Sequence, residues 1–345
     1  MPSKIKFATI GIDHPHANHQ NIQLLASGEF ELVKFWGTDE GKIAEFHKEF
    51  PQAELAGSMQ EILDDDSIQL INCAAIPNDR AAISVASMEH GKDVLVDKLG
   101  VTTLEQLKQV RTVQQSTGRH YYVWYGERLD EPATAKASEL VAAGRIGKVI
   151  QTIGIGPHQI GLHPRPDWFY SKKQTGGILV DILSHQMDQF LHFTGSTEAE
   201  VVASQVGNYR NPQHPELEDF GDVMLRGNGG TGYARVDWLT PNGLDTWGDG
   251  RLIVLGTEGY MEVRKFIDIA GRPGGSHLFV VDQKTTEHVD VSGYTSPFAR
   301  DLAGDVRERT NLALGQEHCF LASKLQLIAE KQAARLGHLT RHPQD

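Results

Sequence analysis

The chain has 345 residues, which predicts two domains because single hydrophobic cores stop growing at roughly 250–300 residues. Its hydrophobic content of 39% is ordinary for a globular protein, and its net charge of −12 argues against binding to nucleic acid or to an anionic membrane surface. The two cysteines lie in apolar stretches and the N-terminal apolar run stops at Asp13, so we expect a cytoplasmic protein without disulfides, signal peptide or membrane span.

Strands and helices alternate over residues 1–126, the expected first domain. The expected strands cover residues 6–12, 31–36, 69–75, 93–96 and 120–125, and the expected helices cover residues 17–27, 42–50, 80–90 and 104–117. This alternation is typical of an α/β domain with a doubly wound parallel sheet. Ligands of such sheets bind beyond the carboxyl ends of the strands, where Gly11, Asn78 and Lys98 are expected to gather.

The pattern changes after residue 126, and residues 127–345 are expected to form a second, α+β domain. Helices are expected at 132–143, near Gly177 and at 316–336, with a strand at 147–156. Further strands are expected at residues 201–209, 220–225, 231–238, 251–255 and 259–263, as in an open, mostly antiparallel sheet. Because few helices remain to cover both faces of this sheet, we expect a homodimer or homotetramer.

The turn after the first strand is the expected phosphate-binding site, with the sequence Gly11-Ile12-Asp13-His14-Pro15-His16. A dinucleotide-binding turn needs small residues so that backbone N–H groups can approach a pyrophosphate, but only the first glycine of that pattern is present. Asp13 opposes an anion unless a cation or a protonated histidine compensates. A metal site formed by Asp13 with His14, His16 and His19 is an alternative. Histidines that line an anion site or bond to the backbone are the preferred interpretation, so no metal is expected.

The helix after Gly177 carries a polar row. At about 100° per residue, Asp181, His185 and Asp188 lie within roughly 60° of one another. The apolar residues on the opposite side are Leu179, Leu183, Met187 and Phe190. The polar row alone is typical of a solvated helix face, whereas the upstream pair Asp97-Lys98, at the end of an apolar run, favours an active site.

Several blocks together resemble the glucose–fructose oxidoreductase / inositol dehydrogenase (Gfo/Idh/MocA) family over residues 4–340. The blocks are Gly11 with His19, residues 76–78, residues 91–98, residues 165–170, and Gly176-Gly177 followed by Asp181, His185 and Asp188. The resemblance implies an N-terminal Rossmann domain and a C-terminal domain with an open sheet. It also implies hydride transfer between a nicotinamide cofactor and a sugar or polyol carbon, and dimers or tetramers built through that sheet.

The resemblance further implies three catalytic residues. Lys98 matches the lysine of the family's Glu-Lys-Pro motif, although Asp97 and Leu99 replace its neighbours, and Asp181 and His185 match the Asp-x-x-x-His motif. Oxidation of a secondary alcohol needs a base for the hydroxyl proton, for which His185 is expected, with Asp181 holding or polarising its surroundings. Lys98 is expected to stabilise negative charge on the alkoxide.

The expected cofactor is NAD, with NADP as the alternative. The acidic residue that the family has at the end of the second strand aligns with Gly37, but Asp39, two positions on, is expected to bind a ribose 2′-hydroxyl and to repel a 2′-phosphate. The expected cofactor-binding residues are Gly11, Ile12, Asp13, His14, Asp39, Ile76, Asn78 and Lys98.

The expected substrate-binding residues are His158, Arg128 and Asp188. His158 and His163 lie in a loop that borders the substrate in the family, and Arg128 matches a family arginine. So many polar groups in one pocket favour a neutral sugar, glycoside or cyclitol over a simple alcohol. We therefore expect an NAD(P)-dependent oxidoreductase; the alternatives are a sugar-modifying lyase or metal-assisted enzyme of the same fold, and a non-catalytic sugar or dinucleotide sensor.

Overall fold

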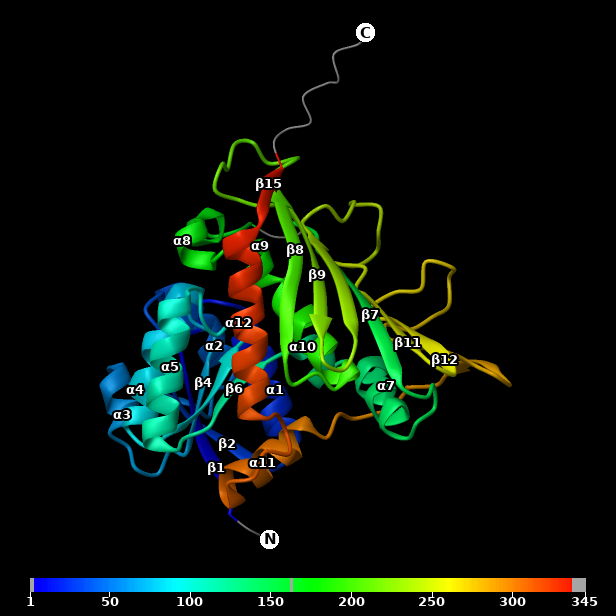
Figure 1. Ribbon diagram of the computed structural model, residues 1–345. Coiled ribbons are helices and arrows are strands. Elements are labelled where there is room, and N and C mark those ends of the chain that lie inside the picture. The colour runs from blue at the N-terminus through cyan, green and yellow to red at the C-terminus, as the bar shows by residue number, and fades with distance from the viewer. Residues whose placement is uncertain (1–2, 162–163, 337–345) are drawn as a thin grey trace. The chain divides into compact units, whose positions relative to one another are not determined.

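The computed structural model describes residues 3–161 and 164–336 (Figure 1). The chain divides into two compact units, which are described separately. Unit 1 contains the residues up to Trp124 together with Pro297–Phe320, and unit 2 contains Tyr125–Ser296 together with the residues from Leu321 onward. The boundary expected after residue 126 lies close to the first crossing, but the return of residues 297–320 to unit 1 was not predicted.

The described residues of unit 1 contain a six-stranded parallel sheet in the order β3-β2-β1-β4-β5-β6. Its strands are β1 (Ile5–Ile10), β2 (Phe30–Trp36), β3 (Glu54–Leu55), β4 (Leu70–Cys73), β5 (Asp93–Asp97) and β6 (Tyr121–Trp124). The predicted doubly wound sheet is confirmed, with the short β3 as an additional strand. Because the strand order reverses between β1 and β4, their carboxyl ends border the crevice in which such sheets bind ligands.

Unit 1 also contains helices, most of which connect these strands. They are α1 (His16–Ala26), α2 (Glu40–Glu49), α3 (Met59–Leu63), η1 (Pro77–Asp79), α4 (Arg80–Glu89), α5 (Leu104–Thr117) and α11 (Phe298–Glu308), and α12 (Gln316–Gln332) begins in this unit. Helices α3 and α11 were not predicted from the sequence. The returning segment is bonded to the sheet: Arg309 Nη1 donates to Asp93 Oδ2 at 2.5 Å, and Tyr121 N donates to Gln316 Oε1 at 2.8 Å.

Unit 2 is built on a nine-stranded mixed sheet, counted over its described residues, in the order β14-β13-β12-β11-β7-β10-β9-β8-β15. The strands are β7 (Val149–Pro157), β8 (Ala199–Gly207), β9 (Phe220–Gly227), β10 (Thr231–Asp237), β11 (Arg251–Gly256), β12 (Gly259–Arg264), β13 (His277–Asp282), β14 (Thr286–Val289) and β15 (Ala334–Leu336). Two pairs, β7 with β10 and β8 with β15, are parallel, and the others are antiparallel. The predicted open, mostly antiparallel sheet is confirmed. The helix expected over 316–336 was too long, because it ends at Gln332 and β15 follows.

Helices α7, α9 and α10 pack on this sheet. The helices described in this unit, besides the end of α12, are α6 (Gly126–Leu129), α7 (Pro132–Ala142), η2 (Asp167–Tyr170), α8 (Lys172–Thr175), α9 (Ile178–Asp181) and α10 (Leu183–Thr194). Helix α7 packs on β12 and β13, and α10 packs on β7 and β10. Figure 1 shows both helices as green ribbons beside the sheet. Close packing of α10 requires glycine at position 154, because a Cβ atom there would lie 2.7 Å from Cγ of Gln186. Within residues 3–161 and 164–336, no helix has both the length and the apolar character needed to cross a bilayer.

Candidate active site

The turn after β1 is joined to the end of β4. Gly11 has φ +82°, and a Cβ atom on it would lie 2.4 Å from Cβ of Ala75, so only glycine fits. The N–H of His14 donates to the carbonyl of Ala74 at 3.0 Å. Ile12, Ile76, Asn78 and Lys98 follow the ends of β1, β4 and β5, so the expected cofactor residues of unit 1 lie at one edge of the sheet. This is the edge at which a doubly wound sheet holds a dinucleotide.

Asp13, which opposes an anion in this turn, has a cation beside it. Lys42 Nζ donates to the carbonyl of Asp13 at 2.7 Å and lies 3.9 Å from its Oδ1. Burial raises the pKa of Asp13, and Lys42 partly offsets that shift. Lys42 reduces the repulsion of a pyrophosphate, since its positive charge balances that of the carboxylate. The turn therefore fits a dinucleotide despite its single glycine.

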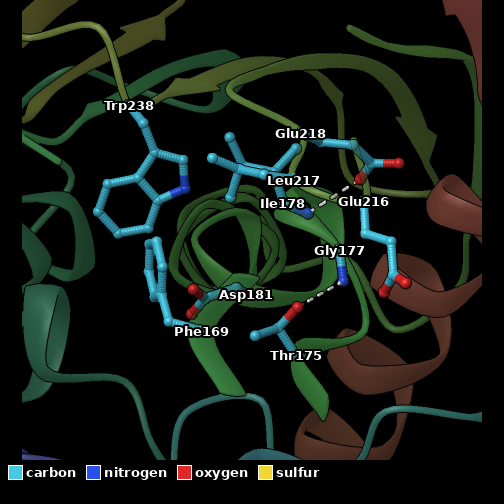
Figure 2. Close-up of a pocket in the computed structure, with 9 residues that line it drawn as sticks. All are labelled: Phe169, Thr175, Gly177, Ile178, Asp181, Glu216, Leu217, Glu218 and Trp238. Atoms are coloured by element: carbon cyan, nitrogen blue, oxygen red, sulfur yellow. Dashed lines mark hydrogen bonds between the residues drawn. The ribbon is translucent and has the colours of Figure 1, made fainter. Parts of the chain in front are cut away.

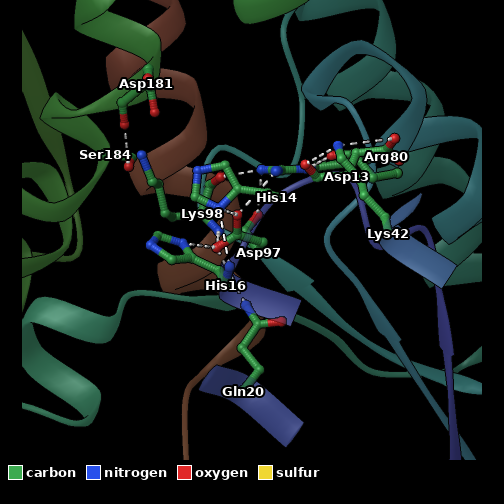
Figure 3. A network of polar contacts seen from close by, with 11 residues as sticks. Asp13, His14, His16, Gln20, Lys42, Arg80, Asp97, Lys98, Asp181 and Ser184 are labelled. Carbon is green, nitrogen blue, oxygen red and sulfur yellow. Dashed lines mark hydrogen bonds and ion pairs between the residues drawn. The ribbon is translucent and has the colours of Figure 1, made fainter. Parts of the chain in front are cut away.

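Asp97, the residue before Lys98, is the centre of a buried network (Figure 3). Its Oδ1 accepts hydrogen bonds from His16 Nδ1 at 2.9 Å, from Gln20 Nε2 at 3.3 Å and from the backbone N–H of Lys98 at 2.8 Å. Its Oδ2 lies 3.0 Å from Arg80 Nη2. Burial opposes ionisation, but His16 and Arg80 outweigh it and hold the pKa of Asp97 well below its usual range.

The same network contains the histidines for which a metal site was an alternative. His14, His16 and Asp97 bring three potential ligand atoms within 4.8 Å of one another, whereas Asp13 is not part of this group. Oδ1 of Asp97 already accepts from the three donors named above, Oδ2 is in an ion pair with Arg80, and Nδ1 of His14 accepts from the backbone N–H of His16 at 3.2 Å. Burial, followed by the neighbouring His16, lowers the pKa of His14 well below its usual value. The geometry is that of a hydrogen-bonded network that ties the phosphate turn to the end of β5.

Lys98 is held in place through its backbone. Lys98 is 6% exposed, and its backbone carbonyl accepts from Arg80 Nη1 at 2.5 Å. Leu99 follows with φ +45°, an unusual conformation for a branched side chain, so the chain turns sharply after the lysine. The family motif has proline after the lysine, whereas this chain has Leu99. Here the backbone of Lys98 is fixed by hydrogen bonds to Arg80 and Asp97 and by the sharp turn at Leu99.

The adenosine end of the expected cofactor site begins after β2. Gly37 packs against Ile12, because a Cβ atom at Gly37 would lie 2.7 Å from Cγ1 of Ile12. Asp39 is the N-cap of α2, and its Oδ1 accepts from the N–H of Lys42 at 2.9 Å. One oxygen of Asp39 is therefore used in capping, which the sequence reasoning did not anticipate.

In unit 2, Asp181 and His185 lie on two consecutive helices with little break between them. Ile182, between α9 and α10, keeps helical angles of φ −69° and ψ −42°. His185 is 5% exposed and Asp188 is 0% exposed. Asp181 is only half-buried. The interpretation of a solvated helix face is therefore wrong for His185 and Asp188, which are buried.

The start of α9 is fixed by two glycines and a carboxylate. Gly176 and Gly177 both have positive φ, and Glu218 Oε2 accepts from the N–H of Ile178 at 3.1 Å. Asp181 lines a pocket next to Phe169 and Trp238, with Glu218 on its far side (Figure 2). Arg165 lies over both rings, 4.9 Å from the centroid of Phe169 and 5.1 Å from that of Trp238. Burial lowers the pKa of Arg165 and the nearby Asp181 opposes this, so a cation and an anion face the same aromatic wall.

The expected substrate residues of unit 2 have different surroundings. The ring of His158 lies 5.2 Å from that of Trp238 and 4.5 Å from that of Trp247, and the backbone N–H of His158 donates to the carbonyl of Asp237 at 2.7 Å. Arg128 and Asp188 are bonded to each other. His163 lies outside the described residues. Lys98 belongs to unit 1, whereas His158, Arg128 and Asp188 belong to unit 2, so their surroundings are described separately.

Comparisons with known proteins identify the family. Residues 5–125 match the oxidoreductase family with an NAD-binding Rossmann fold, and residues 134–262 match the GFO/IDH/MocA C-terminal domain. A crystal structure of a protein from Erwinia carotovora atroseptica SCRI1043 is 45% identical, with a TM-score of 0.94, and the match covers 97% of this chain and 100% of that one. The chain belongs to the Gfo/Idh/MocA family.

Curated relatives of this Gfo/Idh/MocA protein are more distant. The scyllo-inositol 2-dehydrogenase (NAD(+)) of Bacillus subtilis strain 168 is 24% identical over 298 residues, which are 84% of this chain and 83% of the relative. The D-xylose dehydrogenase of Paenarthrobacter nicotinovorans is 25% identical over 154 residues, which are 43% of this chain and 39% of the relative. The protein is an NAD(P)-dependent oxidoreductase with an NAD(P)-binding Rossmann domain.

Several residues around α9 and α10 of this Gfo/Idh/MocA protein were not predicted from the sequence. Trp238 directly follows β10, and Trp247 lies nine residues further on. Nothing in the sequence around either tryptophan predicts that it lies beside His158. Glu127, next to Arg128, is buried and bonded to Lys265, which is 138 residues away in the chain. The signal in the sequence was a charged residue at position 127, shortly after the buried strand β6.

Proposed function

We propose that the protein transfers a hydride between a nicotinamide cofactor and a hydroxyl-bearing carbon of a neutral sugar, glycoside or cyclitol. The observation that carries this proposal is the buried position of His185, 5% exposed, one helical turn after Asp181. A buried imidazole near a carboxylate suits proton transfer to and from a hydroxyl group. The named activities of two relatives, on scyllo-inositol and on D-xylose, support a polyhydroxylated substrate.

In the proposed mechanism the bound nicotinamide supplies the hydride acceptor. His185 removes the hydroxyl proton as the carbon is oxidised, and returns it in the reverse direction. Asp181 favours the protonated imidazole that forms. For Lys98, whose backbone is fixed by Arg80 and Asp97, we propose the role of stabilising negative charge on the substrate oxygen.

The polar and aromatic groups around α9 support selectivity for hydroxylated rings. Asp181, Arg165 and His158 offer hydrogen-bonding atoms next to the rings of Phe169 and Trp238. A simple secondary alcohol leaves most of these polar groups without a partner, and buried polar groups without partners are costly. We therefore expect low activity on short-chain alcohols.

For the cofactor we propose NAD over NADP. Asp39 and Glu40 put two carboxylates at the start of α2, directly beyond the end of β2. A 2′-phosphate near them is repelled, while a ribose 2′-hydroxyl can donate to the second oxygen of Asp39. Titration of the protein with NADH and NADPH, followed by nicotinamide fluorescence, tests this preference without a substrate.

A substrate panel tests the proposed activity. The purified protein is assayed with NAD and NADP against cyclitols, aldoses, glycosides and short-chain secondary alcohols. We expect the highest kcat/KM for a sugar or cyclitol. A higher kcat/KM for a plain secondary alcohol overturns the substrate class, and tight NADH binding with no turnover on any polyol favours a sensor or a lyase.

A further inference from the structure

A buried charged network lies against α10 and has no part in the mechanism described so far. Glu127, on α6, is 6% exposed, and Lys265, which follows β12, is 0% exposed. Lys265 Nζ donates to Glu127 Oε2 at 2.5 Å and to Gln189 Oε1 at 3.2 Å. The same Glu127 oxygen accepts from Gln186 Nε2 at 3.1 Å and from Gln189 Nε2 at 3.3 Å. One carboxylate oxygen thus accepts from two side chains of α10 and from the lysine that follows β12.

This network contacts α10 immediately after His185. Gln186 directly follows His185, and Gln189 lies four residues after it, about one helical turn further along α10. Glu127 therefore holds α10 at the helical turn that follows the proposed base. Its second oxygen, Oε1, is buried and has no hydrogen-bond donor among the described residues. The carboxylate is thus held by one oxygen while the other stays available.

The charge of Glu127 is maintained by cations around it. Burial alone would raise the pKa of this carboxyl, but Lys265, then His185 and then His158 lower it to about 2. Glu127 is therefore ionised at neutral pH. Coulombic interaction is mutual, so the interaction that favours ionised Glu127 also favours the protonated form of His185.

We propose that Glu127 is a positioning residue that orients His185 through α10 and stabilises its imidazolium form during proton transfer. This inference rests on the proposed role of His185 as the base. In alcohol oxidation the hydroxyl proton moves to the imidazole as the hydride leaves the carbon, and the new positive charge forms close to the Glu127 carboxylate. In ketone reduction the same proton returns to the alkoxide oxygen. Glu127 itself gains and loses no proton.

Several other groups face this site and set the background for its titration. Facing Glu127 are Lys265 after β12, His158 after β7 and Glu131 of α7, whose own pKa burial raises to about 7. Asp181 lies one helical turn before His185, and Asp188, which follows by three residues, is paired with Arg128. Of these, Glu131 offers a matched control: it is a buried glutamate close in sequence that accepts from Ser276 and caps α7.

The test is the titration of His185 itself, which needs no substrate. Protein labelled with ¹³C-histidine is titrated by NMR, and His185→Ala identifies the signal. Glu127→Gln removes a negative charge near the ring, so the pKa of His185 should fall by about one unit, with a smaller fall for His158. Glu131→Gln should leave it unchanged. An unchanged His185 titration in folded Glu127→Gln overturns the proposal.

The opposite substitution keeps the proposal testable if Glu127→Gln does not fold. Lys265→Met removes a cation from the same network, so the pKa of His185 should rise, and a fall or no change contradicts the proposal. Once a substrate is known, the pH profile separates the roles. In Glu127→Gln the acidic limb of kcat/KM should move to lower pH while the plateau falls, whereas damage to packing alone lowers the plateau without moving the limb.

Discussion

Arg128 and Asp188 form a bidentate ion pair in unit 2, with Nε–Oδ2 and Nη2–Oδ1 distances of 2.6 and 2.7 Å. The Asp188 side chain is 0% exposed and that of Arg128 is 9% exposed. The pair joins α6 to α10 beside the helix face that carries His185. Both residues were expected to bind substrate, a role that stays a prediction, but the geometry supports a structural role first.

Asp188→Asn should therefore lower stability more than affinity. Removing one partner leaves the buried guanidinium without its counter-charge, which costs about 3–5 kcal/mol. Urea unfolding measures this loss. The double variant Arg128→Met/Asp188→Leu removes both charges and should recover much of the stability. If Asp188→Asn instead keeps wild-type stability and raises only KM, the pair serves the substrate.

Substitution of the proposed catalytic residues should abolish turnover without unfolding the protein. His185→Ala removes the base, and Lys98→Met removes the ammonium group while keeping the aliphatic stem. Each should reduce kcat by about 10²-fold or more. Circular dichroism and NADH fluorescence serve as controls for folding and cofactor binding. Near-wild-type turnover in both variants would show that the assignment is wrong.

Asp13→Gly should tighten NAD binding. The substitution removes a carboxylate from the phosphate turn and frees Lys42, whose Nζ lies 3.9 Å from Asp13 Oδ1, to meet the anion. Because the pKa of Asp13 is raised by burial, lowering the pH neutralises it, so wild-type affinity should increase as pH falls while the variant loses this dependence. Calorimetric titration at several pH values measures both effects. Weaker binding by the variant would mean that the Asp13 carboxylate contributes to the site.

The buried carboxyl group of Glu330 should make the free energy of unfolding depend on pH. Its carboxyl lies with Glu218 around Lys172 and Arg335, and burial, followed by Glu218, raises its pKa from 4.5 to about 7. A folded-state pKa above the unfolded value favours folding while the group is protonated. Its contribution is therefore complete below pH 4.5 and is lost as the pH rises through about 7.

Glu330→Gln should remove that slope, which is at most about 1.4 kcal/mol per pH unit. Urea unfolding between these pH values measures it for the wild type and the variant. Glu216→Gln, an exposed neighbour that accepts from Lys172 N at 3.0 Å, is the control and should keep the slope. Equal slopes in all three proteins would contradict the raised pKa.

Local sequence patterns predicted the sheet of unit 1 and the core of α10 because both depend on short apolar runs. All four residues of β4 are buried, and α5 was predicted over the same residues, 104–117, that it occupies. The helix end at Gln332 was missed because residues 333–336 keep a helix-compatible composition, and only the pairing of 334–336 with residues 205–207 of β8 makes β15 a strand. Local pattern carries no information about such a partner.

The site was predicted in part for the same reason. His185 and Asp181 were found because they share one helix face. The partners that define their environment lie far away in sequence: Glu127 bonds to Lys265, and Asp97 bonds to His16, 81 residues earlier. Asp39 was expected to bind ribose, and its capping role depends on where α2 begins, which sequence predicts only to within a few residues.

One face of the nine-stranded sheet carries an apolar row across four strands. Met224 of β9, Tyr233 of β10, Ile153 of β7 and Ile253 of β11 are cross-strand neighbours in register. Met224 is 54% exposed, and Leu255, farther along β11, is 41% exposed. Helices α7 and α10 pack on the sheet, and the buried residues of its strands alternate with this row. The row therefore lies on the face that α10 does not cover.

We propose that a second copy of the chain covers this face, giving a homodimer or homotetramer. An apolar face buried against its own copy removes exposed side chains from water through a self-complementary contact. Ile153→Glu places a charge at the centre of the row, so sedimentation should show monomers where the wild type sediments as an oligomer at micromolar concentration. Ile22→Glu, at an exposed isoleucine on α1 that is 46% exposed, is the matched control and should leave the oligomer intact. A wild-type protein that is monomeric at that concentration contradicts the proposal, as does an oligomer that survives Ile153→Glu unchanged.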